Sequence, residues 1–528
     1  MARQFLCTST EPVVQTRAGK LRGFRLDGIY TFQGIRYAQA KRFLPPSPVS
    51  PWEGVKDALS YGPISPLLDT PSPQGEIMIP HLFWPENENC QYLNIWSKSL
   101  DKAAKLPVMV WLHGGGYSAG SSIEQVAYIG DNLAQHGDVV VVTLNHRLNI
   151  LGYCDLSSFG DKYKNSGNAG MADIVEALKW VKDNIAAFGG DPDKVTIFGQ
   201  SGGGGKVTTL GQIPEAAGLY HRAVVMSGVL TGLITETRDD RPVIRGILEE
   251  LSLKESEVEK LETLPFVVLS RALARVGRKL YKQGINLGMR WAPVPNDYYV
   301  GDPLAAGFTE FAKKVPTMVG SCIAEFSFGV STAGKNKLSP EERRAKVAER
   351  YGEHTDQAIE LFKKAYPGKN ETDLLALDTV FRPGVLEYVE KKSAESTAPV
   401  YSYLFALEFD YDDGKPAWHC ADIPFVFHNT DKVAVCNIQG VTEKLEEQVC
   451  GAYINFAKTG NPGHPSLPDW PAFTGAKKTT MIFDRQSRVG IDYDSALIAL
   501  AKKALPSFSP GEQPPAEEGE DEGRAWLY

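Results

Sequence analysis

A serine lies in the middle of a glycine-rich turn at residues 199–203, whose order Gly-Gln-Ser-Gly-Gly fits the pattern G-x-S-x-G. The β-branched and aromatic residues at 195–198 come directly before it and predict a short buried strand. In this pattern the chain turns sharply from strand to helix, and glycines are needed where neighbouring chain passes too close for a Cβ. The N–H groups of the following helix favour developing negative charge at the turn. Ser201 is therefore a candidate nucleophile, although a glycine-rich loop can also contain a serine by chance.

A second glycine run, His-Gly-Gly-Gly-Tyr at 113–117, follows the almost wholly apolar stretch Leu106–His113, which predicts a strand covered on both faces. Consecutive glycines at the exit of a strand allow backbone N–H groups to turn toward one point, as an oxyanion hole requires. The same run could be only a flexible turn. Its position between a buried strand and the later serine turn favours the oxyanion hole.

A serine hydroxyl is nearly inert at neutral pH until a positioned base takes its proton. In folds that present serine on this kind of turn, the chain order is serine, then acid, then histidine. Of the nine histidines, His419 and His428 have suitable positions after the serine. His419 is favoured because it lies in the loop that follows a predicted strand at 400–405, and His428 is expected to be a structural neighbour.

The acid is less well determined by spacing. Glu325 follows a predicted strand at 315–320 by a few residues, which is a suitable position. Its competitors are four aspartates, and spacing alone does not decide among them: Asp297, Asp412, Asp413 and Asp422.

Strands alternate with helices along much of the chain, which predicts an α/β fold with a mostly parallel central sheet covered by helices on both faces. Ligands bind such sheets beyond the carboxyl ends of the strands, where both the glycine run and Ser201 are expected. We expect a single domain over residues 1–508, with helical insertions near 236–300 and 338–395 that form a lid or gorge wall. The acidic tail at 509–528 is expected to be flexible.

The composition excludes several classes of protein. A hydrophobic fraction of 43% is enough for a sizeable core, and a net charge of −8 argues against a nucleic-acid partner. The seven cysteines are scattered without C-x-x-C spacing, which argues against a zinc site and a disulfide framework. The first residues lack the apolar run of a signal peptide, and no stretch is long enough to span a membrane. We therefore expect a cytoplasmic protein that does not insert into membranes.

Eight separate stretches together resemble the type-B carboxylesterase and cholinesterase family, a branch of the α/β-hydrolases. They occur in the order of that family and cover about residues 12–500, so chance agreement is implausible. The stretches are residues 34–38, 87–96, 113–117, 145–148, 188–192, 199–203, 324–325 and 418–427.

The resemblance implies an α/β-hydrolase fold with Ser201 as nucleophile, Glu325 as orienting acid and His419 as base. It also implies a structural ion pair between Arg42 and Glu88, below the site. The backbone N–H groups implied as the oxyanion hole belong to Gly115, Gly116 and Gly202.

Three positions depart from the family pattern. The family usually has Glu before the nucleophile and Ala after it, where this chain has Gln200 and Gly202. Neither change removes an N–H donor, but the loss of a carboxylate weakens the case for a cationic, choline-like substrate. Secreted relatives link the equivalent of Cys90 to an earlier cysteine, and here Ser65 stands where that partner is expected.

The sequence therefore predicts a serine carboxylesterase that forms an acyl-enzyme on small hydrophobic esters and needs no metal or organic cofactor. Two alternatives stay open: an amidase or carbamate hydrolase with the same triad, and an inactive adhesion or scaffold protein of the same fold. The oligomeric state is open. Gln200 is a candidate substrate-binding residue. Six aromatic residues could line an apolar gorge or could equally be ordinary core: Trp84, Tyr117, Trp291, Phe326, Phe328 and Trp418.

Overall fold

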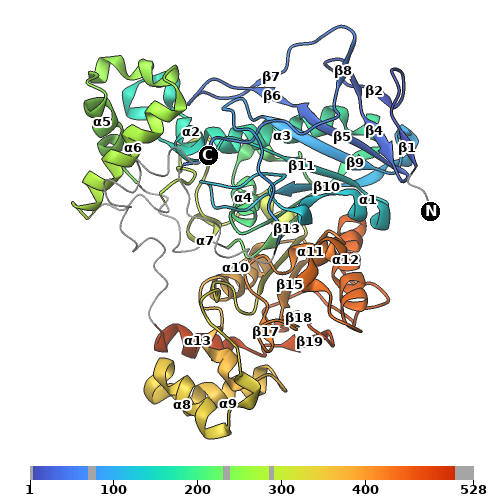
Figure 1. Ribbon diagram of the computed structural model, residues 1–528, viewed down its shortest axis with the longest axis vertical. Helices are drawn as coiled ribbons and strands as arrows, with labels where there is room; N and C mark the ends of the chain where they lie inside the picture. Colours follow the sequence, from blue (N-terminus) through green and yellow to red (C-terminus); the bar gives the residue numbers. More distant parts are fainter. Residues whose placement is uncertain (1–3, 69–78, 230–237, 285–289, 506–528) are drawn as a thin grey trace.

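The computed structural model in Figure 1 describes residues 4–68, 79–229, 238–284 and 290–505. Among these residues, twelve strands form one sheet through the middle of the molecule. The six pairings at the centre are parallel, and the pairings toward both edges are antiparallel. The α/β architecture and the mostly parallel sheet predicted from the sequence are therefore confirmed. The acidic tail lies outside the described residues.

The strands in their order across this sheet are β1 (Phe5–Leu6), β4 (Phe24–Leu26), β5 (Ile29–Arg36), β9 (Tyr92–Ser97), β11 (Val140–Leu144), β10 (Leu106–Leu112), β12 (Gly190–Gln200), β13 (Arg222–Met226), β14 (Thr317–Cys322), β15 (Val400–Phe405), β18 (Thr479–Phe483) and β19 (Arg488–Ile491). Small sheets at the periphery contain β2 (Val13–Gln15) with β3 (Lys20–Arg22) and β8 (Val55–Asp57), β6 (Ala38–Gln39) with β7 (Ser47–Pro48), and β16 (Glu408–Phe409) with β17 (Lys415–Pro416).

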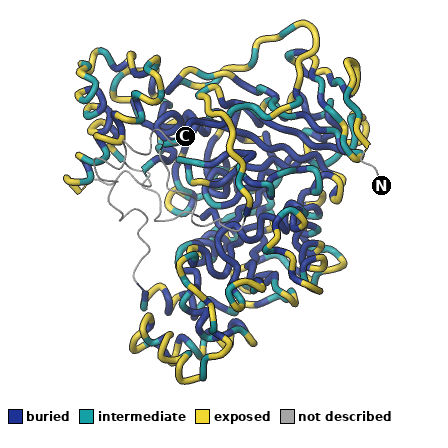
Figure 2. Tube along the Cα trace, viewed as in Figure 1, coloured by how far each residue is buried: buried dark blue, intermediate teal, exposed yellow. Residues whose placement is uncertain are grey.

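Strand β10 shows why the sheet needs helices on both faces. Its side chains alternate between two hydrophobic cores: Val108 and Val110 belong to one core, and Met109 and Trp111 belong to the other. All four are fully buried. Because successive side chains of a strand point to opposite faces, a strand of this composition is stable only when both faces are covered. Figure 2 shows the central strands buried along their length, with exposure concentrated on the outer helices and loops.

The helices that bury apolar side chains in the first core are α2 (Asn149–Tyr153), α3 (Ala169–Asn184), α4 (Gly202–Leu210), α5 (Arg241–Glu250), α6 (Phe266–Tyr281) and α10 (Phe381–Glu395). Those that bury side chains in the second core are α1 (Asp131–Gly137), α8 (Pro340–Tyr351), α9 (Thr355–Ala365), α11 (Ile423–Val426), α12 (Thr442–Thr459) and α13 (Ser495–Ala504). The short helix α7 (Pro303–Ala306) precedes β14.

Helices occupy both predicted insertions. In the first, α5 packs against α6, and the pair protrudes at the upper left of Figure 1. In the second, α8 packs against α9, which packs against α13 at the bottom of the same view. Helix α8 begins with a capping box, since the Ser339 hydroxyl accepts from the Glu342 N–H and the Glu342 carboxylate accepts from the Ser339 N–H. The role of either insertion as a lid or gorge wall stays a prediction.

Candidate active site

Ser201 lies at the turn between β12 and α4, with φ 57° and ψ −127°. A non-glycine residue with positive φ is strained, and such strain persists only where the surrounding structure enforces it. Here the Ser201 N–H donates to the Met226 carbonyl at the end of β13, with an N–O distance of 2.9 Å. The serine is thus held at the carboxyl end of the central parallel strands, as the sequence pattern predicts.

Glycines are required on both sides of the serine because β10 ends against the first turn of α4. A Cβ on Gly203 would lie 2.0 Å from the Leu112 carbonyl oxygen, and a Cβ on Gly199 would lie 2.7 Å from the same atom. Real Cβ atoms essentially never approach this closely. The glycines therefore allow the turn at Ser201 to pack directly against the end of β10.

The glycine run after β10 lies against the same turn. Gly115 and Gly116 have φ values of +81° and +63°, a conformation that side chains rarely adopt. A Cβ on Gly202 would lie 2.1 Å from the Gly116 carbonyl oxygen, so these two backbones are in direct contact. Within the described part of the chain, the N–H groups of Gly115, Gly116 and Gly202 donate no hydrogen bond. Three donors close together without partners are what an oxyanion hole needs.

The ring of His419 is joined to Glu325. Its Nδ1 lies 2.5 Å from the Glu325 Oε2, and its backbone N–H donates to the Glu325 carbonyl at 2.9 Å. The other carboxylate oxygen of Glu325 accepts from the Ser227 hydroxyl at 2.6 Å and from the Cys322 N–H at 2.7 Å. Glu325 is completely buried, so these donors replace water around its charge. Of the competing acids, Asp412 accepts instead from the Thr332 N–H at 2.7 Å.

Gln200 connects the turn at Ser201 to the ring of His419. Its side-chain Nε2 lies 3.3 Å from Nδ1 and 3.4 Å from Nε2 of His419, and its Oε1 accepts from the Cys420 thiol at 3.1 Å. Because Gln200 directly precedes Ser201, the loop that carries His419 lies beside the serine turn. Glu325 and His419, which are more than 90 positions apart along the chain, are thus in direct contact beside the turn that carries Ser201.

Comparison with known proteins identifies the family. A family model described as "Carboxylesterase family" matches residues 10–499. The chain belongs to the carboxylesterase family. It is 32% identical over 506 residues to the para-nitrobenzyl esterase of Bacillus subtilis (strain 168), covering 92% of this chain and 97% of that protein. It is also 31% identical over 483 residues to a phenmedipham hydrolase of Pseudarthrobacter oxydans, with 88% and 93% covered.

Solved structures of esterases are similar to this chain in both sequence and fold. An esterase from Clostridium hathewayi, described as able to hydrolyse aliphatic aromatic polyesters, is 52% identical, with a TM-score of 0.92 over 96% of this chain and 100% of that one. A carboxylesterase of Geobacillus stearothermophilus is 34% identical, with a TM-score of 0.72 over 92% of this chain and 99% of that one. The chain is therefore a carboxylic-ester hydrolase with the α/β-hydrolase fold, which sets aside the inactive scaffold.

Two aromatic rings enclose the imidazole of His419 in this carboxylesterase. The Phe381 ring is stacked on it, with 5.2 Å between centroids and 11° between planes, and the Phe326 ring is tilted at 4.8 Å. Phe381 is buried, whereas Phe326 is 39% exposed. Phe326, one of the predicted substrate-binding residues, is therefore placed where it could touch both the base and a ligand.

The other predicted substrate-binding aromatics are more deeply packed. The Tyr117 hydroxyl bonds to the Thr209 hydroxyl at 3.0 Å, and Trp418 packs on Phe409 with 4.5 Å between centroids. Trp291 is buried in the first core. Their roles in substrate binding stay predictions.

Two further carboxyl groups, Asp378 and Asp422, are buried near Glu325. Burial first, and the charge of Glu325 second, raise the pKa of each to about 7. Asp378 accepts three backbone N–H bonds, whereas the Asp422 Oδ2 accepts from the Tyr403 hydroxyl at 3.1 Å. Both groups are thus partly protonated at neutral pH, which limits the negative charge around Glu325.

The ion pair that the resemblance implies is present. The Arg42 Nε donates to Glu88 at 2.7 Å, and its Nη1 donates to the Leu261 carbonyl. All seven cysteines are free thiols, and the Ser65 hydroxyl, in place of the family's cysteine, accepts from the Leu148 N–H at 3.2 Å.

Among the described residues, one group of side chains could hold a metal ion: His136, His428 and Glu447. Their ligand atoms lie within 4.8 Å of one another. His428, the rival base, stacks on His136 with 4.2 Å between ring centroids, so it belongs to this group. No helix of the described residues combines the length and apolarity needed to cross a membrane.

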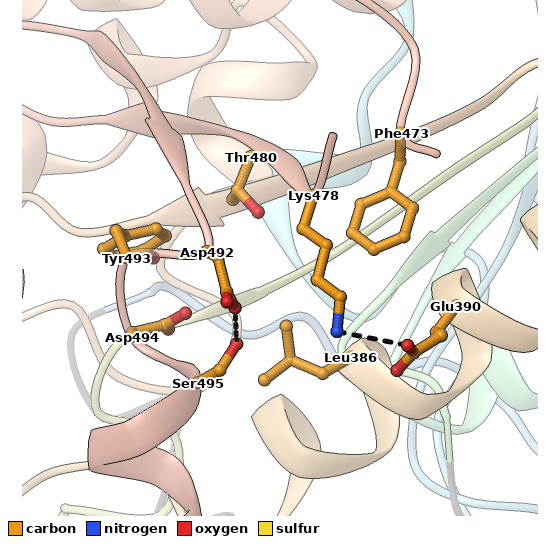
Figure 3. A pocket seen from close by; sticks show the side chains of 9 residues that line it. All are labelled: Leu386, Glu390, Phe473, Lys478, Thr480, Asp492, Tyr493, Asp494 and Ser495. Atoms are coloured by element: carbon orange, nitrogen blue, oxygen red, sulfur yellow. Dashed lines mark hydrogen bonds and ion pairs between the residues drawn. The ribbon is translucent and has the colours of Figure 1, made fainter. Parts of the chain in front are cut away.

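A small hollow of about 30 Å³ lies elsewhere, between α10, β18 and the start of α13 (Figure 3). The Lys478 ammonium and the Glu390 carboxylate form an ion pair of 3.1 Å across it. That volume holds about two water molecules, so the hollow is too small for an ester substrate.

Proposed function

We propose that this carboxylesterase hydrolyses esters through an acyl-enzyme formed on Ser201, with His419 as general base and Glu325 as orienting acid. The observation that carries the proposal is the 2.5 Å contact between His419 Nδ1 and the buried Glu325 carboxylate, beside the strained serine turn. With Nδ1 engaged by Glu325, the Nε2 of the ring is the nitrogen that accepts the serine proton.

The reaction then follows from these positions. Ser201 attacks the ester carbonyl while His419 takes its proton, and the developing oxyanion accepts hydrogen bonds from the N–H groups of Gly115, Gly116 and Gly202. His419 returns the proton to the leaving alcohol. It then activates a water molecule, which attacks the acyl-enzyme and releases the acid. No step needs a metal or an organic cofactor.

The proposed substrates are small hydrophobic esters, aromatic esters in particular. Phe326 offers a partly exposed aromatic face beside the base, and Gln200 leaves the pocket without the carboxylate that a cationic substrate would favour. The likeness to the Clostridium hathewayi esterase supports aromatic diesters as candidates. The same groups could cleave an activated amide or carbamate.

The test uses a fluorophosphonate probe and p-nitrophenyl butyrate with the purified full-length protein. We expect covalent labelling of the wild type, no labelling of Ser201→Ala, and loss of hydrolysis by about 10³-fold or more in Ser201→Ala and His419→Gln. Unchanged labelling or hydrolysis in Ser201→Ala would contradict the proposal. Rates with terephthalate diesters against aliphatic diesters of equal length then test the aromatic preference.

A further inference from the structure

Lys206 is a buried cation next to the proposed active site, and the acyl-enzyme mechanism does not use it. It lies on α4, the helix that starts at the nucleophile turn, and its side chain is completely buried. Its ammonium donates to the His113 carbonyl at 2.9 Å and lies 5.7 Å from the centre of the Tyr117 ring. In the described part of the chain, the one acidic group that acts on it is Glu124, which does so through its charge and not through a hydrogen bond.

A buried ammonium without an ion-pair partner destabilises the folded protein, so its surroundings determine whether it keeps its proton. The imidazoles of His113 and His146 stack at 4.9 Å beside it, and burial together with Lys206 lowers the pKa of both. They are therefore neutral. Glu124 is the acidic group that acts on the lysine, yet burial dominates and lowers the pKa of Lys206 to about 7.

The carbonyl that Lys206 binds belongs to the first residue of the glycine run. The backbone of α4 also packs against this segment, because a Cβ on Gly203 would lie 2.9 Å from the His113 carbonyl oxygen. Lys206 therefore ties the start of the run, which carries two proposed oxyanion donors, to the helix whose first residue, Gly202, carries the third.

We propose that protonated Lys206 is a positioning residue, which holds the segment from His113 to Gly116 against α4 and places a positive charge behind the oxyanion hole. The proposal rests on the function proposed for Ser201. Because a positive charge stabilises a nearby oxyanion more strongly than a neutral amine does, turnover falls when Lys206 loses its proton. The expected profile of kcat is bell-shaped: it rises as His419 becomes neutral and falls again as Lys206 becomes neutral.

The chain offers a matched control in Lys392 on α10. This lysine is also buried, also donates to a backbone carbonyl, that of Ala312, and lies over an aromatic ring, Phe308. Burial likewise lowers its pKa to about 7. Lys392→Met thus reproduces the removal of a buried ammonium without touching the glycine run.

The experiment measures kcat and KM for p-nitrophenyl butyrate from about pH 5.5 to about pH 9.5 in wild type, Lys206→Met, Lys206→Arg and Lys392→Met. We expect Lys206→Met to lose about tenfold to 100-fold in kcat at the wild-type optimum, with KM nearly unchanged and no alkaline limb. Lys206→Arg keeps its charge throughout and should retain activity at alkaline pH. Lys392→Met should keep the wild-type profile.

Four results would overturn the inference: no alkaline limb in the wild type, a wild-type profile in Lys206→Met, an alkaline limb that persists unchanged in Lys206→Arg, or the same change in Lys392→Met. The arginine variant and the wild-type profile remain decisive if Lys206→Met does not fold. Fluorophosphonate labelling separates the two proposals. A wild type that labels at Ser201 while the lysine variants behave normally leaves the function standing and removes the role of Lys206.

Discussion

The contact between Gly116 and Gly202 predicts that the residue usual in this family would harm this enzyme. The type-B pattern has Ala after the nucleophile, where this chain has Gly202. A Cβ there would lie 2.1 Å from the Gly116 carbonyl oxygen and 2.4 Å from its Cα. Both neighbours are backbone atoms, so no side chain can rotate away. Gly202→Ala must therefore displace the glycine run or the turn.

The displacement can be estimated from the same distances. Real Cβ atoms essentially never come closer than 3.0 Å, so the Gly116 peptide must move by about 1 Å from its 2.1 Å position. A shift of about 1 Å in a positioning group can cost about 100-fold in rate, and loss of one oxyanion donor costs about 100-fold to 1,000-fold. We expect Gly202→Ala to lose about 100-fold in kcat. The thermal midpoint should fall modestly, because overpacking a close-packed site typically costs about 1–3 kcal/mol.

The assay compares kcat, KM and the thermal midpoint of Gly202→Ala with those of Gly475→Ala. Gly475 is a fair control, because it is exposed, has no positive φ, and a Cβ there would meet no atom within 4 Å. The expected signature is a fall in kcat with nearly constant KM, since the N–H groups bind the oxyanion and not the ground-state ester. Wild-type kcat in Gly202→Ala would refute the idea that the close contact holds the oxyanion hole in place.

Three further predictions follow from the contacts of the base and its neighbours. Glu325→Gln should lower kcat by about 10³-fold to 10⁴-fold in steady-state hydrolysis, because Nδ1 of His419 loses its carboxylate partner; a loss below tenfold would contradict the triad. Gln200→Glu should move the acid limb of kcat/KM to higher pH, since a carboxylate beside the imidazole stabilises its protonated form; a shift to lower pH, or none, would contradict this contact. Burial raises the pKa of Asp422, so the unfolded chain releases this proton at lower pH than the folded protein does. The free energy of unfolding of the wild type should therefore fall relative to that of Asp422→Asn by on the order of 3 kcal/mol as pH rises from about 4 to about 7. Urea unfolding at several pH values tests this prediction, and a difference between the two proteins that does not change with pH would contradict it.

The parts of the site that the sequence predicted lie at the ends of recognisable strands. Ser201, Glu325 and the glycine run each follow an apolar stretch that forms a parallel strand, respectively β12, β14 and β10. Because the carboxyl ends of parallel strands meet at one edge, the sequence alone predicts that these residues lie together. The sequence determines the position of His419 less well, since a longer loop with the small hairpin of β16 and β17 separates it from β15.

The side chains that surround His419 and Glu325 have no such signal in the sequence. Phe381 reaches the imidazole from the first turn of α10, and Ser227 reaches Glu325 from the loop after β13. Nothing in their local sequence distinguishes them from other core or loop residues, because the contacts join segments distant along the chain. Lys206 shows the same limit: a lysine on a helix is most simply a solvated side chain, and only packing against the glycine run reveals that it is buried.

Two side chains near Ser201, those of Gln200 and Lys206, act in the same electrostatic direction. Gln200 stands where the family pattern has a carboxylate, and its neutral amide lies beside both ring nitrogens of His419. Lys206 places a buried ammonium on α4, the helix that follows Ser201. Removing a negative charge lowers the preference for the protonated imidazole, while adding a positive charge favours the oxyanion over the neutral ester. Both changes disfavour a positively charged alcohol group in the pocket. We therefore expect this arrangement to favour a neutral ester, whose charge develops only on its carbonyl oxygen in the transition state.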